Sequence, residues 1–237
     1  MPEGPYRNTL LRHLDPAIVK RLKLKHTMLE TGRELVAASG PVDHIYFLEE
    51  GIASMTNVFK NGNEVEVGTF GYDSVVGLSA LLGAKLSPTR VFLQIAGHGF
   101  AASAHAAKAE FAEHGPFQEL VLMHAQSQFA QAAQNAACNA VHKHEQRMAR
   151  WLLICGDRIG RDVLDLSHEF LAHMLGSTRS TVTITAGVLK RKGAIDHSRG
   201  CIRILNREKL QTIACECYGV FKAQLDGLTE GLVGRTH

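Results

Sequence analysis

The pattern of apolar and polar residues divides the chain into a short helix, a strand-rich region and a longer run of helices. Apolar residues recur at helical spacing over residues 7–25, which predicts an N-terminal helix. Asn61-Gly62 lies between two strand-like segments and predicts a hairpin, because both residues tolerate positive φ. Glycines punctuate the region, and Gly97-His98-Gly99 is expected to end its last strand, so we expect a small barrel or sandwich. The strands are predicted at residues 42–48, 51–59, 64–70 and 90–96.

A second region is predicted to be helical from about Ala102. Pro116 opens a long helix that runs from Phe117 to about Val141 without glycine or proline. It is rich in alanine and glutamine, which allows another helix to approach closely. Its seam is too polar for a leucine zipper, consisting of Phe117, Leu120, His124, Ser127 and Gln131. Two interpretations remain open: a surface helix packed on its own barrel, or the helix of a dimer.

Residues 166–195 have the pattern of a helix-turn-helix. An amphipathic helix over residues 143–159 precedes it, with Met148, Trp151, Leu152 and Cys155 on one face. Ser167 can cap the first short helix, and Gly176 can end it in the left-handed conformation. Ser177 or Thr178 can cap the second, which Gly193 closes after Val182, Val188 and Leu189 on its inner face. Residues 195–197 and 201–205 then flank a turn and predict a two-stranded wing.

The second helix of this unit would carry the contacts to double-stranded DNA. A helix in the major groove points its first turns at base edges, where an arginine can donate two hydrogen bonds to guanine. Arg179 is the candidate for that contact. The remaining candidate DNA-binding residues carry hydroxyl groups or lie in the wing: Ser177, Thr178, Ser180, Thr181, Thr183 and Arg199. The basic run 190–192 would meet phosphates or form a solvated helix end.

Charge is distributed unevenly along the chain. Residues 1–142 contain 11 basic and 13 acidic residues, whereas residues 143–237 contain 15 and 10, giving net charges of −2 and +5. A basic C-terminal part favours contact with a polyanion at that end only. No apolar run approaches the length of a membrane span, and the N-terminus lacks an apolar signal segment. We therefore expect a cytoplasmic protein whose five cysteines are reduced thiols.

The motifs resemble those of the Crp/Fnr family of transcription regulators over nearly the whole chain. LAHMLGSTRSTVT resembles the family's recognition motif, and HxxEQRMARWLL resembles the helix that begins its DNA-binding domain. IYFLEEGIASM and GYDSVVGLSALLG resemble its cyclic-nucleotide-binding-like β-roll, a jelly roll. The resemblance implies an α+β fold with a β-roll sensor (1–115), a dimerisation helix (116–142) and a winged helix-turn-helix domain (143–237). It also implies a homodimer on a palindromic operator with half-sites about 34 Å apart, and RNA polymerase as a candidate partner.

Two departures from the family pattern bear on the ligands. The cyclic-AMP receptor protein has a glutamate after a glycine to hold ribose, followed by an arginine for the phosphate; here Leu78 follows Gly77, and Arg90 is a loose match. An effector pocket would involve these three residues, but we expect cyclic-nucleotide binding to be weak or absent. Ser180 and Ile184 replace a glutamate and an arginine of that protein's recognition helix, so a different operator is expected. The family's iron–sulfur branch is excluded, because no cysteine precedes Cys138.

The histidines and cysteines give no clear metal pattern. His142 and His144 do not share a helical face, and Cys215-Glu216-Cys217 lacks the spacing of a zinc knuckle. We therefore expect no metal, no cofactor and no enzymatic activity. Two alternatives remain: a regulator that responds to a cyclic nucleotide through a divergent pocket, and a cupin-like metal enzyme. The cupin hypothesis needs converging ligands on strands, yet residues 42–96 hold a single histidine, His44.

Overall fold

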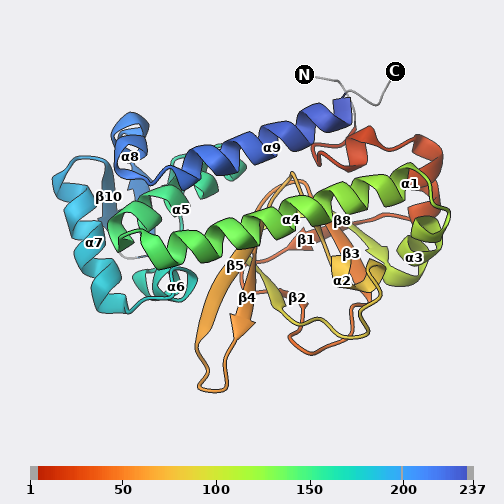
Figure 1. Cartoon of the computed structure of the whole chain (residues 1–237), viewed down its shortest axis with the longest axis horizontal. Coiled ribbons are helices and arrows are strands. Elements are labelled where there is room, and N and C mark those ends of the chain that lie inside the picture. The colour runs from red at the N-terminus through yellow and green to blue at the C-terminus, as the bar shows by residue number, and fades with distance from the viewer. Residues whose placement is uncertain (1–4, 199, 234–237) are drawn as a thin grey trace.

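The computed structural model describes residues 5–198 and 200–233 and shows an N-terminal β-roll, a long helix and a C-terminal lobe (Figure 1). The roll consists of two four-stranded sheets with strand orders β1-β8-β3-β6 and β2-β7-β4-β5. Its strands are β1 (Lys25–Leu29), β2 (Glu34–Val36), β3 (His44–Leu48), β4 (Ile52–Val58), β5 (Glu64–Phe70), β6 (Val75–Val76), β7 (Arg90–Ile95) and β8 (Gly97–Ser103). The predicted α+β class is confirmed.

Helices cover the roll and build the C-terminal lobe. Around the roll lie the 3-10 turn η1 (Leu11–His13) and the helices α1 (Pro16–Leu22), α2 (Leu78–Leu81), α3 (Ala104–Ala112) and α4 (Pro116–Val141). The C-terminal lobe contains α5 (His144–Ile159), β9 (Val163–Leu164), α6 (His168–Met174), α7 (Arg179–Arg191), β10 (Ile195–Ser198), β11 (Cys201–Ile204), α8 (Arg207–Ile213) and α9 (Cys217–Val233). None of the helices in the described part of the chain is long and apolar enough to span a membrane.

The predicted hairpin is confirmed. Strands β4 and β5 pair antiparallel, with Val58 opposite Glu64, and Gly62 adopts a φ of 81° in the turn between them. The expectation for the N-terminus is wrong, because residues 7–25 do not form one helix. Asp15 precedes Pro16 and is extended, since a residue before proline avoids the helical conformation. Its carboxylate then caps α1 by accepting from Ala17 N at 2.7 Å.

Strand β8 departs most from the sequence prediction. Residues 97–99 were expected to end β7, but β8 begins at Gly97 and pairs with both β1 and β3. A Cβ at Gly97 would lie 2.2 Å from Glu50 O, and one at Gly99 would lie 2.2 Å from Phe47 O. Glycine is therefore needed for close backbone approach, which a search for alternating apolar residues does not detect.

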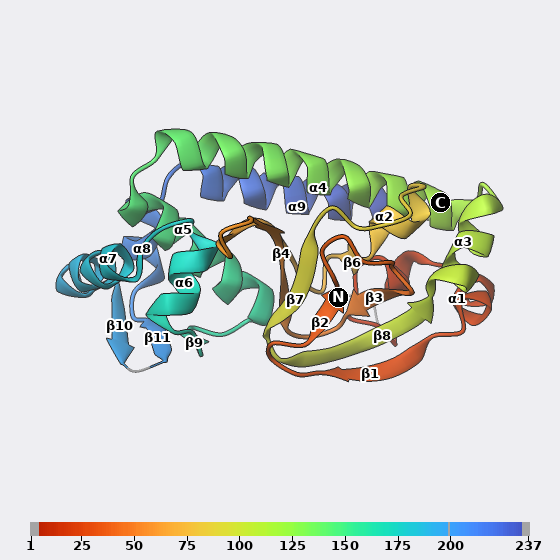
Figure 2. The same cartoon turned by 90° about the horizontal axis from the view of Figure 1, so that it is seen from below.

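Helix α4 packs along the roll through the face that carries the mixed seam. Phe117, Leu120, His124 and Gln131 are all buried there. His124 Nε2 accepts from Val75 N at 3.2 Å, and burial lowers the pKa of His124 to about 4. The polar seam residues thus serve contacts within the subunit. Helix α9 runs beside α4 in the opposite direction (Figures 1 and 2).

Another face of α4 is exposed and repeats at alternating spacings of three and four residues. We call it the α4 stripe: Leu122, Gln126, Phe129, Ala133, Ala136 and Ala140. Leu122 is 47% exposed and Phe129 is 71% exposed. The spacing is that of the contact positions of a coiled coil. A hollow lined mainly by apolar groups lies beside the stripe, between Leu122, Met123 and Gln224 of α9.

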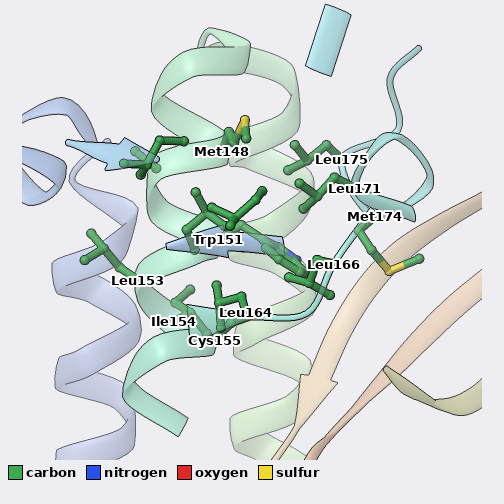
Figure 3. Close-up of a cluster of buried hydrophobic side chains, with 14 of the residues drawn as sticks. Met148, Trp151, Leu153, Ile154, Cys155, Leu164, Leu166, Leu171, Met174 and Leu175 are labelled. Carbon is green, nitrogen blue, oxygen red and sulfur yellow. The ribbon is translucent and has the colours of Figure 1, made fainter. Parts of the chain in front are cut away.

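A single hydrophobic core joins the β-roll to the C-terminal lobe. Figure 3 shows Met148 and Trp151 of α5 together with Leu171 and Leu175 around α6. The same buried cluster includes Ile52, Phe92 and Ile95 of the roll. Phe92 contacts Phe170 of α6 edge-on, with 6.2 Å between ring centroids. The C-terminal lobe is therefore packed directly on the β-roll.

Glu66 of β5 is buried where the roll meets α5. Trp151 Nε1 donates to its Oε1 at 2.8 Å, and Ser54 Oγ lies 2.7 Å from its Oε2. Ser54 has one hydroxyl proton but also lies 2.5 Å from Gln94 Oε1, so the network is complete when Glu66 is protonated and donates to Ser54. Burial correspondingly raises the pKa of Glu66 to about 7.

This raised pKa predicts a pH-dependent effect of Glu66→Gln. The folded protein binds more protons than the unfolded chain between the unfolded pKa of 4.5 and the folded pKa of about 7, so the Glu66 contribution to stability falls as pH rises through that window. A glutamine amide can donate to Ser54 and accept from Trp151 without ionising. We expect the variant to be more stable than wild type by about 3 kcal/mol at pH 8 and nearly equal at pH 4.5. Chemical unfolding across pH measures the difference, and a constant difference would refute the assignment.

Candidate nucleic-acid interface

The helix-turn-helix is built from α6, a glycine turn and α7. Ser167 Oγ accepts from Phe170 N at 3.1 Å and caps α6, as predicted. Gly176 has a φ of 54° after the end of α6, in the left-handed region that favours glycine. Of the two predicted caps for α7, Thr178 fills the role: its Oγ1 accepts from Thr181 N at 3.2 Å. The turn rests on the β4–β5 hairpin, where a Cβ at Gly176 would lie 3.4 Å from the Val65 side chain.

Helix α7 packs through one face and leaves its leading end exposed. Val182, Ala186 and Leu189 are buried against the lobe, while Val188, expected to face inward, is only half-buried. Thr178, Arg179 and Ser180 are all exposed. Among the residues that the structure describes, none forms a hydrogen bond or ion pair with the Arg179 guanidinium. The predicted base-reading arginine therefore points away from the protein core.

The hydroxyl groups predicted to contact DNA fall into two sets. Thr178 Oγ1 lies 2.9 Å from both Ser180 Oγ and Thr181 Oγ1, forming a polar cluster at the start of α7. Thr183 is exposed, but its Oγ1 donates to Arg179 O at 2.9 Å and lies 3.1 Å from His168 Nδ1. Ser177 Oγ is buried beneath the turn. In the first set Thr178 and Ser180 are exposed and Thr181 is half-buried, whereas the hydroxyls of Thr183 and Ser177 are directed into the protein.

The wing forms a small sheet beside α7. Strands β10 and β11 pair antiparallel as expected, and β9 adds a third strand that the sequence did not indicate. Arg199, the predicted phosphate contact in the wing, lies outside the described residues. A polar hollow between α6, α7 and the wing is lined by Ser167, His168, Glu169, Arg179, His197, Ser198 and Gly200. The ring centroids of His168 and His197 are 5.0 Å apart in this hollow. The pKa of His168 is lowered, mainly by burial and to a smaller extent by the nearby His197 and Arg179.

Ion pairs distinguish the basic residues at the end of α7. Lys190 Nζ lies 2.6 Å from Asp196 Oδ1, and Lys192 pairs with Glu145. Arg191 is exposed and forms no ion pair with a carboxylate in the described part of the chain. Ile184, which sequence reasoning treated only as a departure from a relative, is 69% exposed on the same face as Ser180. Ile184 and Arg191 therefore complete the outward surface of α7.

Of the three residues predicted for an effector pocket, Arg90 hydrogen-bonds to carboxylates instead of to Gly77 or Leu78. Arg90 lies on β7, where its guanidinium donates to Glu34 Oε2 at 2.7 Å and to Glu64 Oε1 at 2.9 Å. It also lies over the Phe92 ring, on the side of the sheet that meets α6. Gly77 caps α2, and Leu78 packs against the helical cluster at the other side of the roll. Arg90 is thus engaged by protein carboxylates rather than directed toward Gly77.

The structure also brings together four side chains that the sequence interpretation did not group. Ligand atoms of Cys138, His142, Cys215 and Cys217 all lie within 4.8 Å of one another. Cys138 and His142 are four residues apart at the end of α4, whereas Cys215 and Cys217 flank the start of α9. The helical spacing of Cys138 and His142 was a usable signal, but the pairing with residues more than 70 positions away was not visible in sequence. These side chains form the group that could hold a metal.

Fold and site define a class: a β-roll packed on a winged helix-turn-helix whose recognition helix presents its leading end to solvent. Residues 146–213 match the family model of the Crp-like helix-turn-helix domain. FixK2 from Bradyrhizobium japonicum has the same fold, with a TM-score of 0.69 at 14% identity over 81% of this chain and 98% of that chain. A Crp/Fnr-family regulator from Thermus thermophilus also has this fold, with a TM-score of 0.67 at 23% identity. The match covers 80% of this chain and 98% of that chain.

The curated relatives with similar sequences are transcription regulators. The chain is 28% identical over 184 residues to the transcriptional regulator SdrP of Thermus thermophilus, covering 74% of this chain and 86% of that protein. It is also 28% identical over 177 residues to the global nitrogen regulator of Nostoc sp., covering 70% of this chain and 78% of that protein. The chain therefore carries a Crp-like helix-turn-helix domain and is similar to transcription regulators of the Crp/Fnr type, as its motifs indicated. Its relatives are regulators and not enzymes, which removes the cupin hypothesis.

Proposed function

We propose that the protein binds a palindromic operator as a homodimer and reads bases with the leading end of α7. The observation that carries this proposal is the exposed Arg179 on a helix capped by Thr178. The Arg179 guanidinium donates to guanine O6 and N7 in the major groove. Thr178, Ser180 and Thr181 contact phosphates or base edges with their clustered hydroxyls. Arg191 and Arg199 contact phosphates. The Thr183 hydroxyl is engaged by Arg179 O and His168, and Ser177 lies buried beneath the turn.

A second copy of the chain is the proposed partner of the α4 stripe. The stripe is self-complementary, since two copies related by a twofold axis present the same residues to each other. Its three-and-four spacing suits helix pairing, and Phe129 leaves a large apolar side chain in water. The chain then divides into a sensor (1–115), a dimer helix (116–142) and a DNA-binding part (143–237), with α9 returning along α4.

We further propose that a cyclic nucleotide is not the effector. A cyclic nucleotide needs a carboxylate for the ribose and a free guanidinium for the phosphate, yet Leu78 follows Gly77 and Arg90 is paired with two glutamates. Calorimetric titration with cyclic AMP and cyclic GMP tests this. Binding at physiological concentrations, with a shift in thermal unfolding, would instead support the cyclic-nucleotide-responsive alternative.

Phe129→Glu tests the dimer helix. We expect the dimer dissociation constant to rise by about 100-fold or more, because each interface would then bury two like charges near the twofold axis. The subunit should stay folded, since Phe129 is 71% exposed. Light scattering after size-exclusion chromatography measures the mass. Ala112→Glu, which adds the same charge at an exposed position of α3, is the matched control; equal effects of both variants would reject the stripe.

Operator selection tests the proposed function as a whole. Purified protein is incubated with random duplex DNA, and bound sequences are recovered and sequenced over several rounds. We expect an inverted repeat whose half-site centres are about 34 Å apart, with a guanine in each half-site. Recovery of a non-repeated motif, or of no motif at low salt, would contradict the proposal.

A further inference from the structure

Three thiols and one imidazole converge where the long helix ends and the C-terminal helix begins. Cys138 and His142 come from the last turn and cap of α4, and Cys215 and Cys217 come from the α8–α9 junction. The three cysteines are buried and His142 is half-buried. No ligand in this set comes from a residue of the DNA-reading surface. The cluster therefore forms a separate site, outside the interface described above.

Two distances within the cluster match those of a tetrahedral metal site, and all four ligand atoms lie within 4.8 Å of one another. Cys138 Sγ lies 3.6 Å from Cys215 Sγ, and Cys217 Sγ lies 3.6 Å from His142 Nδ1. Zinc binds sulfur at about 2.3 Å and imidazole nitrogen at about 2.0–2.1 Å, so tetrahedral ligand atoms stand about 3.5–3.8 Å apart. One ion can therefore reach all four atoms with little movement of the side chains.

Two neighbouring side chains orient the ligands. His142 Nε2 lies 3.1 Å from Glu216 Oε1, so a proton on Nε2 leaves Nδ1 free to bind a metal on the cysteine side. Gln134 Nε2 donates to Cys217 Sγ at 3.0 Å, a contact that favours the thiolate over the thiol. A carboxylate behind a ligating histidine is a recurrent feature of zinc sites.

Burial raises the pKa of the Cys138 and Cys215 thiols, and two buried arginines nearby offset part of this cost for an anionic centre. A divalent ion with three thiolates and a neutral histidine carries a net charge of −1. Arg147 and Arg150 of α5 are buried, act electrostatically on Cys138, and form no ion pair with any described carboxylate. The Nε atoms of both are buried without a hydrogen-bond partner. Cys217 also begins α9, where the helix dipole stabilises negative charge.

We propose that Cys138, His142, Cys215 and Cys217 bind one Zn²⁺ ion in a closed structural site. Four protein ligands leave no position for substrate, which distinguishes such a site from a catalytic one. The ion joins the end of α4 to the start of α9. It therefore fixes the orientation of these two helices at the point where the chain enters the C-terminal lobe. A disulfide between Cys138 and Cys215 is the competing outcome, because it would use two of the ligands.

The test uses the full-length protein, purified with a reductant and reconstituted with Zn²⁺ or Co²⁺. Elemental analysis should give one zinc per chain. The Co²⁺ form should show the intense visible absorption of tetrahedral cobalt together with thiolate-to-cobalt charge transfer. Cys217→Ser should lose the bound metal, whereas the control Cys201→Ser in the wing should keep it.

Each contrary result overturns the proposal. Octahedral cobalt spectra, or less than about one-tenth of an ion per chain with all five thiols titratable, would show that the cluster is not a metal site. Retention of zinc by Cys217→Ser would place the ion elsewhere. Isolation of a Cys138–Cys215 disulfide that persists under reducing conditions would replace the metal by a crosslink. Because none of these measurements uses DNA, failure here leaves the proposed function to be judged separately.

Discussion

Arg179→Ala is expected to abolish most of the discrimination between the selected operator and scrambled DNA. An arginine that donates two hydrogen bonds to guanine contributes about 1–3 kcal/mol of discrimination, so two half-sites give about 2–6 kcal/mol for the dimer. The protein should remain folded, because the Arg179 side chain is exposed and holds no other element in place. Fluorescence anisotropy with both DNAs, at several salt concentrations, measures the change.

Arg191→Ala is the matched control for this experiment. It removes the same charge from the other end of α7, where the side chain is also exposed. We expect weaker binding to both DNAs by a similar factor, and a salt dependence that is smaller by about one counterion per lost phosphate contact. If Arg179→Ala behaved like this control and kept its sequence preference, Arg179 would be a phosphate contact rather than a base reader.

Asp73→Asn is expected to cause the largest loss of stability. Asp73 pairs with Arg158 at 2.8 Å, and both side chains are nearly inaccessible to solvent. Arg158 also contacts Thr69 of β5 and lies over the ring of Phe221 of α9, so the pair links the roll, α5 and α9. Removing one partner leaves a buried charge and costs about 3–5 kcal/mol. For a chain of this size the melting temperature should fall by about 6–20 °C.

Two comparisons isolate the cause of that loss. Glu50→Gln removes a carboxylate from the exposed pair with Arg7 and should cost at most about 1 kcal/mol. The double variant Asp73→Asn/Arg158→Met removes both charges and should recover much of the stability. The pKa of Asp73 is held below its usual value chiefly by Arg158 against the effect of burial, so this stabilisation is lost as pH falls through the acid range. A double variant no more stable than Asp73→Asn would point to packing instead of charge.

Part of this structure could be predicted from the sequence, because it depends on the conformational preferences of a few neighbouring residues. The hairpin at Asn61-Gly62, the cap at Ser167 and the left-handed Gly176 each depend on one or two residues whose backbone preferences are strong. The helix-turn-helix could be located for the same reason. Its contact residues were read less well: the exposed position of Thr183 is correct, but its hydroxyl is already engaged by Arg179 O and His168.

Features that depend on long-range packing were not readable in this way. β8 is a strand because Gly97 and Gly99 let other backbones approach, although its residues have low strand propensity. The sequence left two interpretations open for α4, and only the burial of Phe117 and His124 against the roll shows that its mixed seam packs within the chain. The cysteine cluster required two chain segments to meet, and only the tertiary structure brings Cys138 beside Cys215.

The core shared by the two lobes constrains how a signal can pass between them. Phe92 of the roll and Phe170 of α6 are in contact, and Val65 on the hairpin lies where a side chain at Gly176 would meet it. A close-packed interior resists gradual distortion, so reorienting α7 relative to the roll requires these side chains to exchange one set of neighbours for another. We therefore expect any reorientation of the recognition helix to be a cooperative change between discrete packings, and not free motion on a flexible tether.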